Sequence, residues 1–242
     1  MLENLHQIDE TLFLWLHHLI RGEAINEVMW MISDRWIWLP MYLALFVWLW
    51  RRFSWKTTLL ACIAIAFGVL CADQVCAGII RPLVERLRPS HPDNPLSESV
   101  YLVNNYRGAS YGFPSCHAAN TFMLASFITF FAPKCKSLVI WMFTWALLNC
   151  ISRIYLGVHY PGDVLFGGII GSGFGVFWAY VTKLIIQKPW MRKIMSKSRL
   201  DVKNHFTIFS IHFPKSARFN AVIVIGIITL VVIISLAIIN QM

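Results

Sequence analysis

Apolar segments of about helix length alternate with short polar ones along most of the chain. They fill the ranges 36–50, 57–80, 115–132, 137–155, 161–186 and 221–239. The last range contains no charged residue, and the first is expected to extend backwards through 29–32 despite Asp34 and Arg35. A helix that crosses a bilayer needs about 20 mainly apolar residues, since the hydrocarbon offers no partners for backbone polar groups. The pattern therefore predicts an all-α membrane protein, a bundle of six transmembrane helices.

A different pattern opens the chain. In residues 1–20 the acidic side chains lie towards the start, and the apolar ones recur at helical spacing: Leu12, Phe13, Leu16, Leu19 and Ile20. This is typical of an amphipathic helix that lies in the membrane interface. The segment lacks the basic start and the small-residue cleavage site of a secretory signal, so we expect it to remain on the mature protein.

Composition favours one membrane domain. Of 242 residues, 57% are apolar and 14% are charged, whereas soluble domains carry about a quarter charged residues. Six spans with short loops use about 200 residues, so we expect a single integral membrane domain over residues 1–242. The six cysteines form no Cys-x-x-Cys pair and no metal-type spacing with histidine, which argues against a disulfide framework or a zinc site.

Basic residues indicate the orientation. Of 21 lysines and arginines, 14 follow the first, third and fifth apolar ranges, and the side richer in them normally faces the cytoplasm. The segment 188–218 is predicted to be a basic cytoplasmic loop that contacts anionic lipid headgroups. A net charge of +9 is also typical of nucleic-acid binding. The position of this segment between two spans favours the lipid bilayer as partner, and no nucleic acid is expected.

Three short segments carry most of the remaining cations together with two histidines. They are Arg81 to Arg88-Pro89, Pro114-Ser115-Cys116-His117, and Ser152-Arg153 through His159 to Asp163. A phosphoryl group in transfer spreads negative charge over three oxygens, and one arginine can hold two of them. Ionisable groups near membrane spans are normally functional. We therefore predict a phosphoryl-transfer site in an integral membrane protein, and the distribution of lysine and arginine makes it face the periplasm or the cell exterior.

Local spacing suggests how the first two segments contribute. Arg81 and Arg88 are seven residues apart, so on a helix that ends at the following proline they would share one face. Ser115 stands where a helix N-cap is expected. The free amides of Cys116 and His117 would then point at an anion.

The third segment and His117 supply the expected chemistry. Arg153 is a further phosphate ligand, and His159 is placed to attack phosphorus. Asp163 lies four residues after His159 and can accept a hydrogen bond from one ring nitrogen, which leaves the lone pair on the other. His117 can give a proton to the leaving oxygen.

Together these motifs, Arg81-x6-Arg88-Pro89, Pro114-Ser115-Cys116-His117 and Ser152-Arg153-x5-His159-x3-Asp163, resemble the three signatures of the type 2 phosphatidic acid phosphatase family, over roughly residues 57–186. The resemblance implies a six-span helical fold and a lipid phosphate phosphatase that uses no metal or other cofactor and forms a phosphohistidine. It implies His159 as nucleophile, Asp163 as its orienting partner and His117 as general acid. The phosphate-binding residues are then Arg81, Arg88, Ser115 and Arg153, with the amide of Cys116 beside them.

Two positions depart from the family pattern, which usually has lysine at Arg81 and glycine at Cys116. Arginine keeps the charge but changes the reach, so substrate geometry is expected to differ. Cysteine keeps the amide donor, so activity is expected to survive with some sensitivity to oxidation. A cysteine-dependent phosphatase would instead need an arginine six residues after its cysteine, and that position is Phe122.

Several questions stay open at this level. The substrate can be undecaprenyl pyrophosphate, a lipid A phosphate, phosphatidylglycerol phosphate or phosphatidic acid. Arg107, in the polar and aromatic loop 90–113, is a candidate headgroup contact. The alternative function is a non-catalytic phospholipid-binding or transport protein, which has no need of a His159–Asp163 pair and a separate acid. A vanadium haloperoxidase has a similar cluster, but the spans argue against it.

Overall fold

The computed structural model describes residues 2–19, 21–132, 135–191 and 221–241. Its helices are α1 (Leu2–His18), α2 (Glu23–Ser33), α3 (Leu39–Arg52), α4 (Trp55–Asp73), a π-helix (Gln74–Ile80), α5 (Arg81–Val84), α6 (Cys116–Phe131), α7 (Lys136–Tyr155), α8 (Pro161–Gln187) and α10 (Ala221–Ile239). Two 3-10 turns, Pro95–Ser99 and Val103–Asn105, lie between α5 and α6. Within these ranges the β pairing amounts to one isolated bridge, Leu87 to Tyr111, so the all-α prediction is confirmed.

Membrane-spanning length is found in four stretches of the described residues. They are Trp55–Val84, in which α4, the π-helix and α5 are continuous, and the helices α7, α8 and α10. α6 is a shorter apolar helix. The helices α6, α7, α8 and α10 begin and end within one residue of the apolar ranges in the sequence. The chain is an integral membrane protein.

The first predicted span is wrong as a single helix. The chain forms α2 and α3 there, with a turn at residues 34–38 between them. The Asp34 side chain accepts the Trp36 amide at 3.0 Å, and the Trp38 indole donates to the Ile32 carbonyl at 2.9 Å. An aspartate that bonds its own backbone two residues on favours a turn over a helix. The polar pair at 34–35 therefore ends α2 instead of being carried through hydrocarbon.

Close packing of α6 and α8 organises the bundle. Gly167, Gly171 and Gly175 recur every fourth residue of α8, so they share one face. A β-carbon at each would lie 2.0 to 2.5 Å from a backbone oxygen of α6 or of its N-cap. Small residues let membrane helices approach to backbone contact in this way. The contact sets the starts of α6 and α8 side by side, where the Ser115 amide donates to the Asp163 carbonyl at 2.9 Å.

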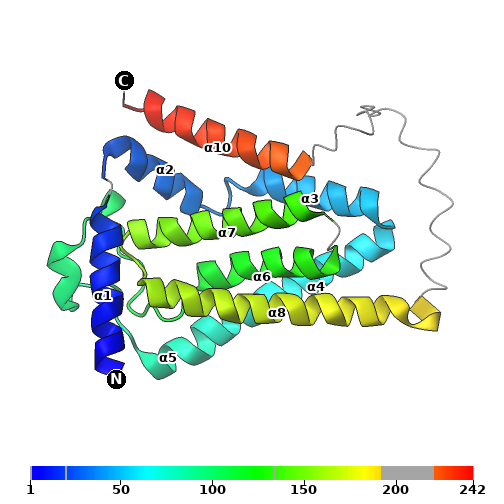
Figure 1. Cartoon of the computed structure of the whole chain (residues 1–242), viewed down its shortest axis with the longest axis horizontal. Helices are drawn as coiled ribbons and strands as arrows, with labels where there is room; N and C mark the ends of the chain where they lie inside the picture. Colours follow the sequence, from blue (N-terminus) through cyan, green and yellow to red (C-terminus); the bar gives the residue numbers. More distant parts are fainter. Residues whose placement is uncertain (1, 20, 133–134, 192–220, 242) are drawn as a thin grey trace.

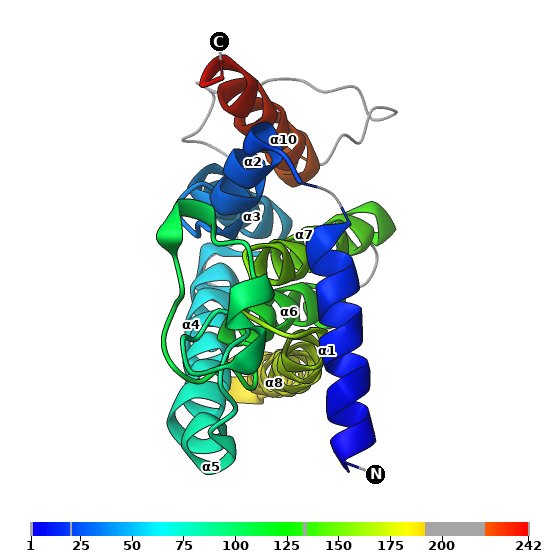
Figure 2. The ribbon, with the colours of Figure 1, turned by 90° about the vertical axis from the view of Figure 1, so that its left-hand side faces the viewer.

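The N-terminal helix lies across the bundle. In Figure 1, α1 crosses the ends of α7 and α8, on the side where α6 and α8 begin. Seen from that side in Figure 2, α1 and the segment between α5 and α6 lie over the ends of the bundle helices. Phe13 of α1 is buried against Tyr160, with ring centroids 5.4 Å apart. This end of the molecule therefore has a covering layer built from two separate parts of the chain.

Part of the predicted basic loop has no described structure. Of the predicted basic loop 188–218, residues 192–218 lie outside the described residues, and so does Lys134. The last span, predicted at 221–239, is α10 with those bounds. It packs beside α2 and α3 (Figure 1).

Candidate active site

The structure brings the three motif segments together at the end of the bundle that α1 covers. Arg88 Nη1 lies 3.0 Å from His159 Nε2, which joins the first segment to the third. Arg81 Nη2 donates to the Pro114 carbonyl at 3.2 Å, which joins the first to the second. The Ser115–Asp163 backbone bond described above joins the second to the third. Residues up to 82 positions apart, Arg81 and Asp163, thus lie around one point.

His159 lies in the turn between α7 and α8 and is 1% exposed. A guanidinium can only donate, so His159 Nε2 accepts from Arg88 and the ring proton is on Nδ1. Nδ1 lies 3.4 Å from Asp163 Oδ2 and donates towards it. Burial, together with the site arginines, lowers the pKa of His159 well below 6.5. The ring is therefore neutral at neutral pH, with its lone pair on Nε2 facing the arginines.

Three arginines around this histidine have unused donors. Arg88 donates to the Val158 carbonyl at 2.8 Å, and Arg153 donates to the Ser33 hydroxyl. The Nε atoms of Arg81, Arg88 and Arg153 are buried without a hydrogen-bond partner in the described structure. None of the three forms a salt bridge with a described carboxylate. Unpaired buried charge is costly, so the cluster is built to receive an anion.

Burial and the neighbouring arginines both act on the charge of Arg88. Burial, followed by the charges of Arg81 and Arg153, lowers the pKa of Arg88 to about 10. Arg88 still carries its charge at neutral pH. A bound phosphate would relieve both the repulsion and the lack of partners, because it accepts several charge-assisted hydrogen bonds at once.

The segment Pro114 to His117 forms the start of α6. Ser115 is its N-cap, fully buried, and its hydroxyl oxygen accepts the Ala118 amide at 3.5 Å. The hydroxyl proton stays available as a donor, as do the first amides of the helix. The Cys116 side chain packs against a small buried cluster that contains Cys76, so its thiol is engaged in packing while its amide is at the open start of the helix. His117, in the first turn, is exposed.

The predicted helical link between Arg81 and Arg88 is wrong. The helix ends at Val84, because Glu85 is in the left-handed conformation with φ 49°. Residues 86–88 are extended instead and pair with 110–112: the Gly112 amide donates to the Arg86 carbonyl at 2.9 Å, and the Arg88 amide donates to Ser110 at 3.1 Å. A long-range backbone pairing therefore places Arg88, and helix periodicity does not.

Two residues of the site carry no sequence prediction. A β-carbon on Gly112 would lie 3.0 Å from Asp163 Oδ2 and 3.6 Å from His159 Nδ1, so this glycine lies directly against the pair. Arg86 Nη1 lies 3.1 Å from Asp163 Oδ1. Residues two apart in an extended stretch share a face, so recognising 86–88 as extended would have grouped Arg86 with Arg88. Gly112 has no comparable local signal.

The candidate headgroup contact Arg107 lies in the covering loop and is exposed. Its Nη1 donates to the Ser90 carbonyl at 2.6 Å, and the Ser90 hydroxyl donates to the Arg107 carbonyl at 2.8 Å. This double link closes the loop at its base. The structure does not bring Arg107 into hydrogen-bond contact with the arginine and histidine cluster of the described residues.

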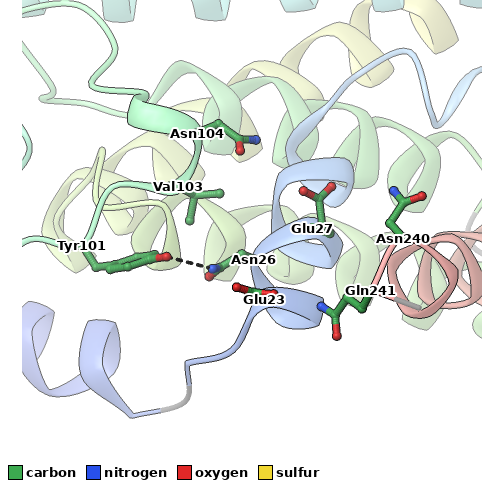
Figure 3. Close-up of a pocket in the computed structure, with 8 residues that line it drawn as sticks. All are labelled: Glu23, Asn26, Glu27, Tyr101, Val103, Asn104, Asn240 and Gln241. Atoms are coloured by element: carbon green, nitrogen blue, oxygen red, sulfur yellow. Dashed lines mark hydrogen bonds between the residues drawn. The ribbon is translucent and has the colours of Figure 1, made fainter.

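A separate polar pocket lies at the same end of the molecule (Figure 3). Its volume is about 230 Å³. It is lined by α2, the 3-10 turn Val103–Asn105 and the end of α10: Glu23, Asn26, Glu27, Tyr101, Val103, Asn104, Asn240 and Gln241. None of the motif residues lines it. Nor do three or more His, Cys, Asp or Glu side chains gather anywhere in the described ranges as a metal site would require.

Comparisons with known proteins agree with this arrangement. The profile of the PAP2 superfamily matches residues 62–187. The lipid A 4'-phosphatase of Bacteroides thetaiotaomicron is 44% identical over 180 residues, which are 74% of this chain and 79% of that protein. The lipid A 4'-phosphatase of Porphyromonas gingivalis is 32% identical over 192 residues, 78% of this chain and 79% of that one.

A solved structure extends the likeness to the fold. The crystal structure of the first transmembrane PAP2 type phosphatidylglycerolphosphate phosphatase from Bacillus subtilis superposes with a TM-score of 0.54 at 26% sequence identity, and the match covers 76% of this chain and 89% of that one. The matched profile spans the segments that build the cluster around His159. The chain therefore belongs to the PAP2 superfamily, as a membrane enzyme that hydrolyses lipid phosphates.

Proposed function

We propose that this protein removes the 4'-phosphate of lipid A through a phosphohistidine on His159. The observation that carries the chemistry is a neutral, buried His159 whose Nε2 accepts from Arg88, with the charges of Arg81 and Arg153 nearby. None of these arginines has a carboxylate partner among the described residues. The choice of lipid A rests on the two relatives named lipid A 4'-phosphatase, one of them 44% identical over most of both chains. The residues of the cluster are suited to bind the phosphate group, which all candidate lipids share. The choice among these lipids therefore follows the substrate in the names of the relatives.

In the first step His159 Nε2 attacks phosphorus, and the bond from phosphorus to the lipid oxygen breaks. Desolvation and the nearby arginines lower the pKa of His117 to about 3 in the empty site. The bound phosphate offsets the arginine charges, so the ring can hold the proton that it gives to the lipid oxygen, and the lipid leaves as an alcohol. Arg81, Arg88 and Arg153 hold the equatorial oxygens, whose charge they offset in the transition state. Arg88 exchanges its contact with Nε2 for a phosphate oxygen, which frees the lone pair for attack.

In the second step water attacks the phosphorus of the phosphohistidine. His117, now neutral, accepts a proton from this water, and the bond from phosphorus to Nε2 breaks. Inorganic phosphate leaves and the His159 ring returns to its neutral form. Throughout both steps Asp163 keeps the Nδ1 proton in place and stabilises the charge that develops on the ring.

The membrane placement belongs to the same proposal. The distribution of lysine and arginine puts the loops after the first, third and fifth apolar ranges in the cytoplasm, so the cluster around His159 faces the periplasm from a bacterial inner membrane. The crossing position of α1 over the bundle ends (Figure 1) supports its lying in the outer interface. A lipid phosphate would then enter from the outer leaflet with its tails in the bilayer.

The test is phosphate release by the purified protein in detergent. Bis-phosphorylated lipid A, undecaprenyl pyrophosphate, phosphatidylglycerol phosphate and phosphatidic acid are compared at equal surface concentration. We expect the highest kcat/KM for lipid A, with loss of the 4'-phosphate, and a drop of at least about 10³-fold in His159→Ala. His91→Ala is the control, since the His91 ring accepts the Asp93 amide at 3.2 Å in the covering loop. Preference for another lipid would refute the substrate, and wild-type turnover by His159→Ala would refute the nucleophile.

A further inference from the structure

One face of α1 lies on the outer layer of the active site. His6, Asp9, Phe13 and His17 are three or four residues apart, so they share that face. Phe13 packs on Tyr160, and His17 Nδ1 donates to the Ile154 carbonyl at 3.2 Å. These contacts reach the chain on both sides of His159. The N-terminal helix thus touches the segment that carries the nucleophile, and does so through polar as well as apolar side chains.

Asp9 makes the polar link. Its Oδ2 accepts from Arg86 Nη1 at 2.7 Å, and its Oδ1 accepts the Gly162 amide at 2.7 Å. Arg86 Nη1 also donates to Asp163 Oδ1 at 3.1 Å. The Arg86 guanidinium lies over the Tyr160 ring, 3.8 Å from its centroid. One arginine therefore bridges the carboxylate on α1 and the carboxylate that orients the nucleophile.

The contact with Arg86 helps to fix the orientation of the Asp163 carboxylate. Asp163 is fully buried, and its Oδ2 accepts the Tyr160 amide at 3.0 Å and faces His159 Nδ1 at 3.4 Å. Its Oδ1 is held by Arg86. With both oxygens engaged, the carboxylate cannot rotate about its Cβ–Cγ bond without losing a charge-assisted bond. Arg86 thus keeps Oδ2 on the histidine.

Arg86 in turn depends on α1. The side chains of Arg86 and Asp9 are 18% and 14% exposed, and that of Asp163 is 0% exposed. An ion pair with so little solvent contact is held more rigidly than a surface pair. A β-carbon on Gly162 would lie 2.6 Å from Asp9 Oδ2. The glycine at this position of α8 therefore leaves room for the Asp9 carboxylate.

We propose that Asp9 and Arg86 are positioning residues of the reaction, which act on His159 through Asp163. The inference rests on the proposed role of His159 as nucleophile. It makes the N-terminal helix part of the catalytic apparatus, although neither Asp9 nor Arg86 touches the phosphate ligands through a described hydrogen bond. Their effect should fall on the chemical step and not on substrate binding, because they align the attacking nitrogen and leave the three phosphate arginines in place.

The experiment measures kcat and KM for phosphate release from bis-phosphorylated lipid A by the full chain in detergent. We expect Arg86→Gln to lower kcat by about 10- to 100-fold, because misalignment of reacting groups reduces the rate by factors of this size. KM should stay within about twofold of the wild-type value. Arg86→Lys should recover most of the loss, because one ammonium can still bridge both carboxylates. Asp9→Asn should lower kcat by about 3- to 10-fold. Glu3→Gln makes the same charge change on the exposed side of α1 and should leave kcat within twofold.

The double variant Asp9→Asn/Arg86→Gln separates a shared pathway from two structural losses. If Asp9 acts through Arg86, the double variant is no slower than Arg86→Gln alone, whereas independent effects multiply. Thermal unfolding of each variant checks the fold. The inference is overturned by multiplying effects, by a rise in KM at unchanged kcat, or by wild-type kcat in Arg86→Gln. His159→Ala is assayed alongside: if it is inactive while Arg86→Gln is unaffected, the proposed function stands and the positioning role does not.

Discussion

Gly112→Ala adds one methyl group beside His159 and Asp163 and leaves the proposed reacting residues unchanged. The added methyl would lie 3.0 Å from Asp163 Oδ2, 3.1 Å from Arg88 Cγ and 3.6 Å from His159 Nδ1. Ordinary van der Waals contact begins at about 3.4 Å, so Asp163 and Arg88 must each give way by a few tenths of an ångström. The Asp163 carboxylate is held on both oxygens and is buried, so it cannot move freely.

The expected size of the effect follows from that displacement. A misplacement of 1 Å in an active site costs about 100-fold in rate, so a shift of about 0.3 to 0.4 Å predicts a kcat about 4- to 6-fold lower, or about 1 kcal/mol in the barrier. The Nδ1 to Oδ2 distance is already 3.4 Å, and further lengthening removes the hydrogen bond. Overpacking of this size costs about 1 kcal/mol in stability.

Phosphate release and thermal unfolding in detergent measure the two effects on one sample. The matched control is Gly173→Ala in α8, where a β-carbon meets nothing within 4 Å. That variant should keep wild-type kcat and gain about 0.5–1 kcal/mol in stability, since alanine favours a helix interior over glycine. A Gly112→Ala enzyme that folds and keeps kcat within twofold of wild type would refute the account of this site as tightly constrained.

Two further predictions concern the elements that hold the site. Gly171→Ala places a β-carbon 2.0 Å from the Ala119 carbonyl oxygen, so α6 and α8 must separate and the free energy of unfolding should fall by about 3 kcal/mol or more; an unchanged unfolding temperature would contradict the backbone contact. His17 is buried, its Nε2 accepts the Tyr101 amide at 3.0 Å, and burial together with Arg21 lowers the pKa of His17 to about 4. Between pH 6.5 and 4 the unfolded chain therefore binds a proton that folded His17 does not, so stability is lost as pH falls through this window, by at most about 3 kcal/mol. In His17→Gln the unfolding temperature should depend less steeply on pH over that range, and an equal slope would exclude His17 as the source.

Local patterns in the sequence determined the helices and much of the chemistry. Apolar runs set the bounds of α7, α8 and α10, and Ser115 is the N-cap of α6 as its position predicts. The four-residue spacing of His159 and Asp163 brings their side chains to 3.4 Å. These features depend on residues within one or two helical turns, and helix periodicity and capping are properties of that range.

The tertiary structure decided how the arginines meet and what holds His159 and Asp163. Arg88 reaches His159 because residues 86–88 pair with 110–112, and Asp163 is held by Arg86, 77 positions earlier in the chain. A glycine such as Gly112 and an aspartate such as Asp9 occur in many surroundings, so neither residue type indicates its partner from the local sequence. Their contacts exist because α8 packs on α6 through glycines and α1 crosses the bundle end. A helix leaves a periodic pattern in the local sequence, whereas the packing of distant segments leaves no such pattern in a single sequence.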